Sequence, residues 1–214
     1  MTGSKLATAF VPAHPTNFTK GRALKPTEII IHHMAGVASA ADCGAIFARP
    51  HRNGSSHYGI GVGGEIAQYV SESDTAWDSP HYMTGISIEN ANCERGGGWK
   101  VSDETLSSLI RLVADIAERY GLYPLVPGRN LTWHSMYDAT ACPGDYLRGR
   151  MAQIAEEANK IIKEKHMTDF NSYPGNDNIP ADWAKDDVEW AVKNKILRGD
   201  ERGLRLRDTV TREE

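Results

Sequence analysis

The stretch Glu28-Ile29-Ile30-Ile31-His32-His33 decides the fold that we expect for this chain. Its run of β-branched apolar residues, bounded by polar ones, is typical of a short strand that is buried on both faces. His32 and His33 close the run, so the strand is expected to deliver two imidazoles to an edge of its sheet. Edges of this kind are where α/β proteins hold their functional groups.

The elements that follow alternate between helix and strand. Residues 39–48 are expected to form a short helix, and residues 57–62 and 65–70 are expected to form two strands. Gly63-Gly64 lies between these strands and is a tight-turn signal. We therefore expect the two strands to pair as a hairpin.

The rest of the pattern completes one α/β domain. Residues 85–91 and 131–134 supply two further strands. Between them, Ser102 is an N-cap for a helix whose apolar residues recur at helical spacing, and a last helix is expected from about Tyr146 to Lys165. This order predicts a mixed central β-sheet flanked by helices.

Composition excludes some classes of partner. The 214 residues are 40% hydrophobic, with 24 Lys and Arg against 28 Asp and Glu and a pI near 6.1. Such a chain can bury a sizeable core but lacks the basic surplus that drives nucleic-acid binding. No stretch approaches the ~20 apolar residues of a membrane helix, so no membrane anchor is expected. Residues 1–19 lack a signal-peptide pattern, which predicts synthesis in the cytoplasm.

A change of composition divides the chain. Residues 166–180 are rich in Asn, Asp, Gly, Pro and Ser and have no apolar period, which is typical of a linker. We therefore expect a main domain over residues 1–165 and a separate segment over residues 181–214. That segment begins with an amphipathic helix that ends near Arg198-Gly199.

Four side chains have the chemistry of a metal site. His32 and His33 end the buried strand, and His134 and Cys142 lie in a distant segment with seven residues between them. Imidazole and thiolate suit zinc, and three protein ligands would leave a fourth position for water, as in catalytic zinc sites. Spacing alone does not show that these residues meet, and a lone cysteine is more often a small buried hydrophobe.

Several segments together resemble a known family. Residues 29–36 (IIIHHMAG), 56–60 (SHYGI), 86–89 (ISIE) and 134–144, which end in Ala-Cys-Pro-Gly, are similar to the type 2 N-acetylmuramoyl-L-alanine amidases. Phage endolysins and animal peptidoglycan recognition proteins belong to that superfamily. The resemblance covers roughly residues 24–165 in the expected order, so it implies that residues 1–165 form the catalytic domain.

The resemblance also implies a ligand set. His32, His134 and Cys142 are expected to hold one Zn²⁺ per chain, with His33 beside them in a packing role. The other cysteines, Cys43 and Cys93, match no role in the family. We expect both to be buried free thiols.

Three further residues are implied as catalytic. Tyr58 matches a tyrosine near the zinc water and could orient that water or donate to the oxyanion. Glu89 matches a glutamate that could serve as general base. Thr140 lies where several members have lysine, so a neutral hydroxyl would take the place of a charged donor. Asp78 replaces a histidine that is frequent in the family.

The implied activity is hydrolysis of the amide bond between N-acetylmuramic acid and L-alanine in bacterial peptidoglycan, as a phage or prophage endolysin that lyses the cell wall. Such an enzyme is made in the host cytoplasm and acts at the wall. Two alternatives remain open at this point. One is a peptidoglycan recognition module without catalysis, and the other is a cytosolic amidase that recycles muropeptides.

The carboxy-terminal segment has a shorter resemblance. Four stretches are similar to the first part of an S-layer homology repeat, a module that holds proteins on secondary cell-wall polymers: Trp183-Ala184, residues 188–192, Gly199-Asp200 and residues 206–213. The second helix of that repeat is missing. The segment is therefore either a partial wall-binding module or an amphipathic helix that packs on the amidase.

Overall fold

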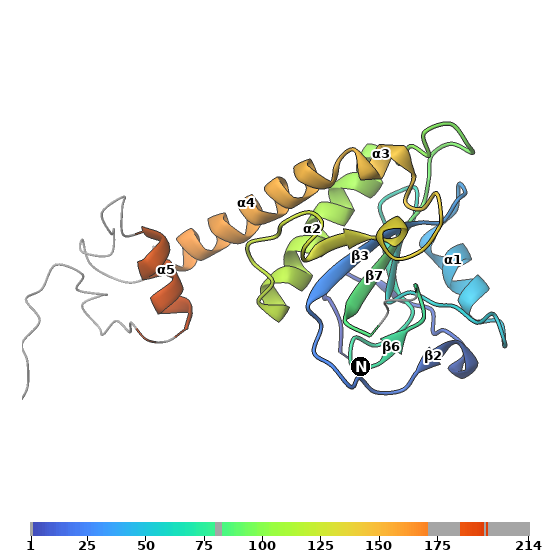
Figure 1. Ribbon diagram of the computed structural model, residues 1–214, viewed down its shortest axis with the longest axis horizontal. Coiled ribbons are helices and arrows are strands. Elements are labelled where there is room, and N and C mark those ends of the chain that lie inside the picture. Colours follow the sequence, from blue (N-terminus) through green and yellow to red (C-terminus); the bar gives the residue numbers. More distant parts are fainter. Residues whose placement is uncertain (1, 80–82, 171–184, 195, 197–214) are drawn as a thin grey trace, which may run out of the picture. The chain divides into compact units, whose positions relative to one another are not determined.

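The computed structural model describes residues 2–79, 83–170, 185–194 and 196 (Figure 1). Two compact units divide the chain, Met1–Asn159 and Lys160–Glu214. The first unit contains every residue that the sequence singles out for chemistry. No helix in the described ranges has the length and apolar character needed to cross a membrane.

A mixed sheet forms the centre of the first unit (Figure 1). Its strands, in spatial order, are β1 (Ala9–Phe10), β5 (Ile66–Gln68), β4 (Tyr58–Ile60), β7 (Gly85–Asn90), β3 (Glu28–His33) and β8 (Leu131–Trp133). Strand β3 runs parallel to β7 and β8, and β7 runs parallel to β4. Strands β4 and β5 form the expected antiparallel hairpin. The predicted fold class is confirmed.

The deciding stretch lies near the middle of this sheet. All six residues of β3 are buried, and Ile29, Ile30 and Ile31 have no exposed surface. Neighbouring strands cover both edges of β3, and the helix of residues 103–120 packs against it, so the apolar run is enclosed. Within β3, the candidate functional residues are the two histidines at its carboxyl end.

Two helices lie on opposite sides of the sheet (Figure 1). Helix α1 (Ala40–Phe47) begins at a capping box in which Ser39 and Asp42 satisfy each other's backbone N–H groups. Helix α2 (Asp103–Tyr120) begins at the predicted N-cap Ser102 and ends at Gly121, whose φ of 70° is left-handed. Apolar residues of α2 at helical spacing are buried and pack toward β3 and β4.

The single helix expected from Tyr146 to Lys165 is two helices. Helix α3 (Gly144–Arg148) ends at Gly149, and helix α4 (Met151–Phe170) begins two residues later. Glycine is a poor helix former because it loses more backbone entropy than other residues. Helix α4 also continues past Lys165, where the sequence analysis ended the catalytic domain.

Several short elements were not expected. They are η1 (Pro15–Asn17), η2 (His134–Met136), the edge strand β1, and a small antiparallel pair of β2 (Phe18–Thr19) and β6 (Thr75–Ala76). Strands of two residues carry no measurable alternation, so the sequence cannot indicate them. The β2–β6 pair matters for the site because Trp77 and Asp78 follow β6 directly.

The second unit includes helix α5 (Lys185–Lys193), which falls within the amphipathic helix expected near the carboxyl end. Trp190 on this helix is 60% exposed. The predicted linker beyond residue 170, and most of the segment that resembles an S-layer homology repeat, lie outside the described residues. The division into domains at residues 165 and 180 therefore stays a prediction.

Candidate metal centre

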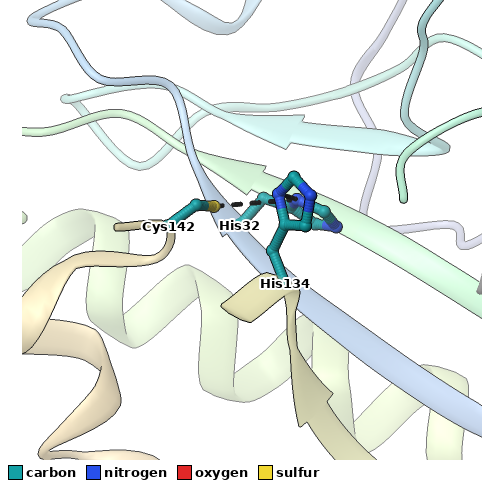
Figure 2. Close-up of side chains that lie close together, drawn as sticks. All are labelled: His32, His134 and Cys142. Atoms are coloured by element: carbon teal, nitrogen blue, oxygen red, sulfur yellow. Dashed lines mark hydrogen bonds between the residues drawn. The ribbon is translucent and has the colours of Figure 1, made fainter. Parts of the chain in front are cut away.

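Three predicted ligands converge from distant parts of the sequence (Figure 2). His32 ends β3, His134 begins η2 directly after β8, and Cys142 lies just before α3. Nδ1 of His32 is 3.2 Å from Nδ1 of His134 and 3.7 Å from the Cys142 sulfur. Among the described residues, these three form the one group of His, Cys, Asp and Glu side chains close enough to hold a metal ion.

These separations fit zinc. With Zn–N bonds of about 2.0–2.1 Å and a Zn–S bond of about 2.3 Å, a tetrahedral site places two nitrogens about 3.3 Å apart and a nitrogen and a sulfur about 3.6 Å apart. The 3.2 Å and 3.7 Å separations match those two edges closely. The parallel pairing of β3 with β8 explains the convergence, because it brings the carboxyl ends of both strands to one edge of the sheet.

Backbone contacts hold Cys142 in place. The N–H of His33 donates to the Cys142 sulfur at 3.4 Å, and the Cys142 N–H donates to the Thr140 hydroxyl at 3.2 Å. Gly144 has a φ of 83°, and a Cβ there would lie 2.6 Å from the Cβ of Trp99. Only glycine fits such a position without strain. The ring of His33 also packs edge-on against Trp99, which is the packing role expected for it.

A buried carboxylate anchors the element that carries His134. Glu28, at the start of β3, accepts hydrogen bonds from the hydroxyls of Thr132 and Tyr137. Thr132 lies in β8, and Tyr137 follows η2. His134 is therefore held between two residues that are fixed to the same strand as His32.

Burial sets the protonation of the ligands. Desolvation lowers the pKa of His32 well below its ordinary value, and the nearby rings of His134 and His33 lower it further. Burial also lowers the pKa of His134, against a smaller raising effect of Asp138. Both imidazoles are thus neutral at pH 7, the form that binds metal. Burial and the Glu89 charge raise the pKa of the Cys142 thiol, so metal binding must release its proton.

The cluster opens into a cavity of about 610 Å³. Its walls come from the ends of β3 and β7, from α1, and from the loops around residues 52–55, 77–78 and 140–142. Arg52 and Arg95 add positive charge to this wall. This volume is within the range of ligand-binding sites, and a ligand in the cavity would lie next to His32 and His134.

Glu89 faces this cavity from β7. Its register partner on β3 is His32, and paired residues of neighbouring strands point to the same side of a sheet. Glu89 Oε2 is buried without a hydrogen-bond partner among the described residues. Desolvation and the charge of Asp78 raise the Glu89 pKa to about 8, against an opposing effect of Arg52. A carboxylate with a pKa near neutrality suits proton transfer.

Substituting Glu89 with glutamine is expected to stabilise the metal-free protein at high pH. A group whose folded-state pKa is raised contributes full stability below its unfolded pKa and loses that stability as pH rises through the folded pKa. For Glu89 this window runs from its ordinary 4.5 to about 8. The melting temperature of Glu89→Gln should therefore exceed that of the wild type by an amount that is small at pH 5 and largest above pH 8.

Thermal melts of both proteins in chelator at pH 5, 6.5 and 8.5 measure this difference. Each kcal/mol corresponds to about 2–4 °C for a chain of this size. A difference that stays constant with pH would contradict the raised pKa.

Tyr58 does not reach the cluster, which corrects the expectation from the sequence. Its register partner on β7 is Ile88, the neighbour of Glu89, so Tyr58 points to the opposite face of the sheet. There its hydroxyl donates to Glu72 at 2.7 Å and accepts from the Ser4 N–H at 2.7 Å. Arg119 and Tyr120 of α2 bind the same Glu72 carboxylate. Tyr58 is part of a buried structural network.

Tyr58→Phe is therefore expected to weaken the fold and to leave intact the hydrolysis that the resemblance implies. The change leaves the Ser4 N–H unpaired and removes one donor from the buried Glu72 carboxylate, at a cost of about 1–3 kcal/mol. Chemical denaturation would measure this loss, and amino-group release from cell walls at 25 °C would measure hydrolysis. If the Tyr58→Phe protein kept its stability but lost most of its turnover, Tyr58 would have a role in the reaction after all.

Thr140 and Asp78 both line the cavity. Because the Thr140 hydroxyl accepts from the Cys142 N–H, its own proton remains available to a ligand in the cavity. Asp78 Oδ1 lies 3.8 Å from His32 Nε2, on the side of the ring away from the cluster. Burial raises the Asp78 pKa to about 7, and the hydroxyls of Ser87 and Ser79 lower it by less. The resemblance indicates a substitution at Asp78 but implies no role for it.

The other cysteines lie outside the cluster. Cys43 and Cys93 are both free thiols, as expected. Cys43 is a buried residue of α1, whereas Cys93 is exposed, which corrects the expectation that both are buried.

Comparison with known proteins agrees with this geometry. A family model described as N-acetylmuramoyl-L-alanine amidase matches residues 22–145, more than half of the chain. No curated protein gives a significant match in sequence. The matched range contains all three candidate ligands, Glu89 and Thr140.

Solved structures share the fold. PlyL is 17% identical, with a TM-score of 0.58 over 70% of this chain and 95% of that one. A mutant endolysin from Bacillus subtilis is 17% identical, with a TM-score of 0.57 over 70% and 97%. AmpD is 20% identical, with a TM-score of 0.54 over 71% and 95%.

Proposed function

The chain belongs to the N-acetylmuramoyl-L-alanine amidase family, and on that premise we propose that it is a zinc-dependent hydrolase of bacterial peptidoglycan. His32, His134 and Cys142 would hold one zinc ion per chain. The observation that carries the proposal is the set of 3.2 Å and 3.7 Å separations in this cluster, which match the edges of a tetrahedral zinc site.

The reaction is hydrolysis of one amide bond. The bond between the lactyl carbonyl carbon of N-acetylmuramic acid and the nitrogen of L-alanine breaks. Water supplies the oxygen of the new carboxyl group, and a proton is delivered to the leaving amine. A zinc ion in this site would lower the pKa of a bound water toward ~7 and polarise the carbonyl.

Two side chains of the cavity complete the chemistry. Glu89 takes the proton from the attacking water and passes it to the amine, because it faces the cluster and has a pKa near neutrality. Thr140 donates its hydroxyl proton toward the developing oxyanion, a role that its place beside Cys142 supports. The hydrogen bond that the Thr140 hydroxyl accepts from the Cys142 N–H also holds this donor next to a metal ligand.

Removal and return of zinc test the proposal. Chelator treatment is expected to stop the release of free amino groups from purified cell walls, and one equivalent of Zn²⁺ is expected to restore it. Mg²⁺ serves as the control because it prefers oxygen ligands. Full activity in a chelated, metal-free protein would overturn the zinc dependence.

We further infer a phage or prophage endolysin role. A solved structure with the same fold is described as an endolysin, which supports this role by analogy of fold alone. An endolysin made inside a bacterium reaches the wall only when the membrane is opened. Expression inside a susceptible host should therefore leave cells intact until a pore-forming agent is added, and lysis without that agent would contradict the role.

The segment after residue 180 is proposed to bind a secondary cell-wall polymer. Its resemblance to an S-layer homology repeat supports this, as does the exposed Trp190 on α5, since aromatic rings stack on sugars. A chain ending at Phe170 is expected to lose co-sedimentation with purified walls while it keeps its melting temperature and its hydrolysis of soluble muropeptides. A marked drop in melting temperature would instead favour packing on the amidase.

A further inference from the structure

Asp78 is a buried carboxylate that the proposed reaction does not use. Its side chain is 1% exposed, and the His32 side chain is 2% exposed. Neither oxygen of Asp78, nor Nε2 of His32, has a hydrogen-bond partner of standard geometry among the described residues. Burial of a carboxylate that only the Ser79 and Ser87 hydroxyls approach, without a bond of standard geometry, is costly, so a fold that places one beside a metal ligand indicates a use for it.

The geometry of His32 defines that use. Its Nδ1 faces His134 and Cys142, while its Nε2 faces Asp78 Oδ1 at 3.8 Å. The two nitrogens of an imidazole point outward in different directions. Asp78 therefore lies behind the ring, beyond hydrogen-bond distance of Nε2 but close enough that a small side-chain shift would let it accept from Nε2–H, and it does not belong to the group of side chains that could share the ion.

We propose that Asp78 is a positioning residue that fixes the tautomer and the orientation of His32 for zinc. A carboxylate that accepts from the outer nitrogen keeps the proton on Nε2, leaves the lone pair on Nδ1 and makes that nitrogen more basic. This role rests on the proposed zinc site and adds to it a residue outside the ligand set.

The segment that carries Asp78 is rigid enough for this task. The preceding residue, Trp77, exchanges backbone and side-chain hydrogen bonds with Ser55. The Trp77 indole N–H also donates to the Thr19 hydroxyl at 2.8 Å. Strand β6, immediately before Trp77, pairs with β2. Asp78 is thus tied to the small sheet and is not on a free loop.

The second histidine provides a natural control. Asp138 Oδ2 lies 4.0 Å from His134 Nε2, so both ligands have a carboxylate near the outer nitrogen. However, the Asp138 side chain is 54% exposed, whereas that of Asp78 is 1% exposed. Water competes for an exposed carboxylate and screens its charge. The proposal therefore predicts a strong effect at Asp78 and a weak one at Asp138.

Zinc affinity of the full chain tests the role, measured by competition with a chromophoric chelator at pH 7.5. Asp78→Asn is expected to weaken zinc binding by about 10–100-fold, and Asp138→Asn by less than about threefold. The metal-free Asp78→Asn protein should melt at or above the wild-type temperature, because the change removes a buried charge. Zinc affinity of Asp78→Ala should recover in part with added formate, which replaces the carboxylate.

The possible outcomes distinguish a failure of the positioning role from a failure of the zinc site. Wild-type affinity in Asp78→Asn, or equal losses in Asp78→Asn and Asp138→Asn, would overturn the positioning role while leaving the zinc site intact. A wild-type chain that takes up no zinc would overturn the proposed function itself, and the positioning role with it.

Discussion

Cys142→Ser is expected to lose both its zinc and its hydrolysis of cell walls, with activity at the level of a blank without enzyme. Serine is close to cysteine in shape, so the fold should persist. A hydroxyl does not ionise near neutral pH and is a poor zinc ligand, whereas a thiolate is a preferred one. The sulfur supplies one vertex of the cluster, 3.7 Å from His32 Nδ1.

Metal content by elemental analysis and amino-group release from purified walls would measure the two losses. Cys93→Ser is the matched control, because Cys93 is an exposed free thiol outside the cluster. A Cys142→Ser protein that retains one zinc per chain and wild-type turnover would contradict the ligand assignment.

Glu89→Gln is expected to lower turnover by about 10²–10⁴-fold, the usual contribution of a general base. Its zinc content should stay at the wild-type level, since Glu89 is not a member of the ligand group. The amide of glutamine has nearly the shape of the carboxyl group but cannot accept a proton. The loss should therefore fall on kcat, with KM little changed.

A loss of turnover through unfolding can be distinguished from a loss of proton transfer. The same substitution is expected to stabilise the metal-free protein at high pH, so a slow but stable enzyme points to proton transfer. Glu94→Gln, at an exposed position, is the control. Wild-type turnover in Glu89→Gln would mean that another group moves the proton.

The sequence predicts the fold well where its pattern is strong. The isoleucine run of β3, the hairpin of β4 and β5, and the capped helix α2 each carry a local signal, and each is present in the structure. The ligands are a different case. His32 and His134 are 102 positions apart in the chain, so only the family resemblance placed them together.

Side-chain direction is what the sequence could not supply. Tyr58 and Glu89 lie on neighbouring strands, and a shift of one residue in register would exchange the faces to which they point. The observed pairing of Tyr58 with Ile88 turns Tyr58 away from the cavity. Asp78 follows a two-residue strand and has no periodic neighbours, so nothing in the sequence indicates that it lies behind His32.

Identification of the bond that is cut tests the central claim most directly. Purified cell walls would be digested with the zinc-loaded chain, and newly formed amino termini would be labelled and identified, with new reducing sugars measured in parallel. We expect L-alanine as the new terminus and no increase in reducing sugars. New reducing ends without alanine termini, or termini from within the peptide stem, would contradict it.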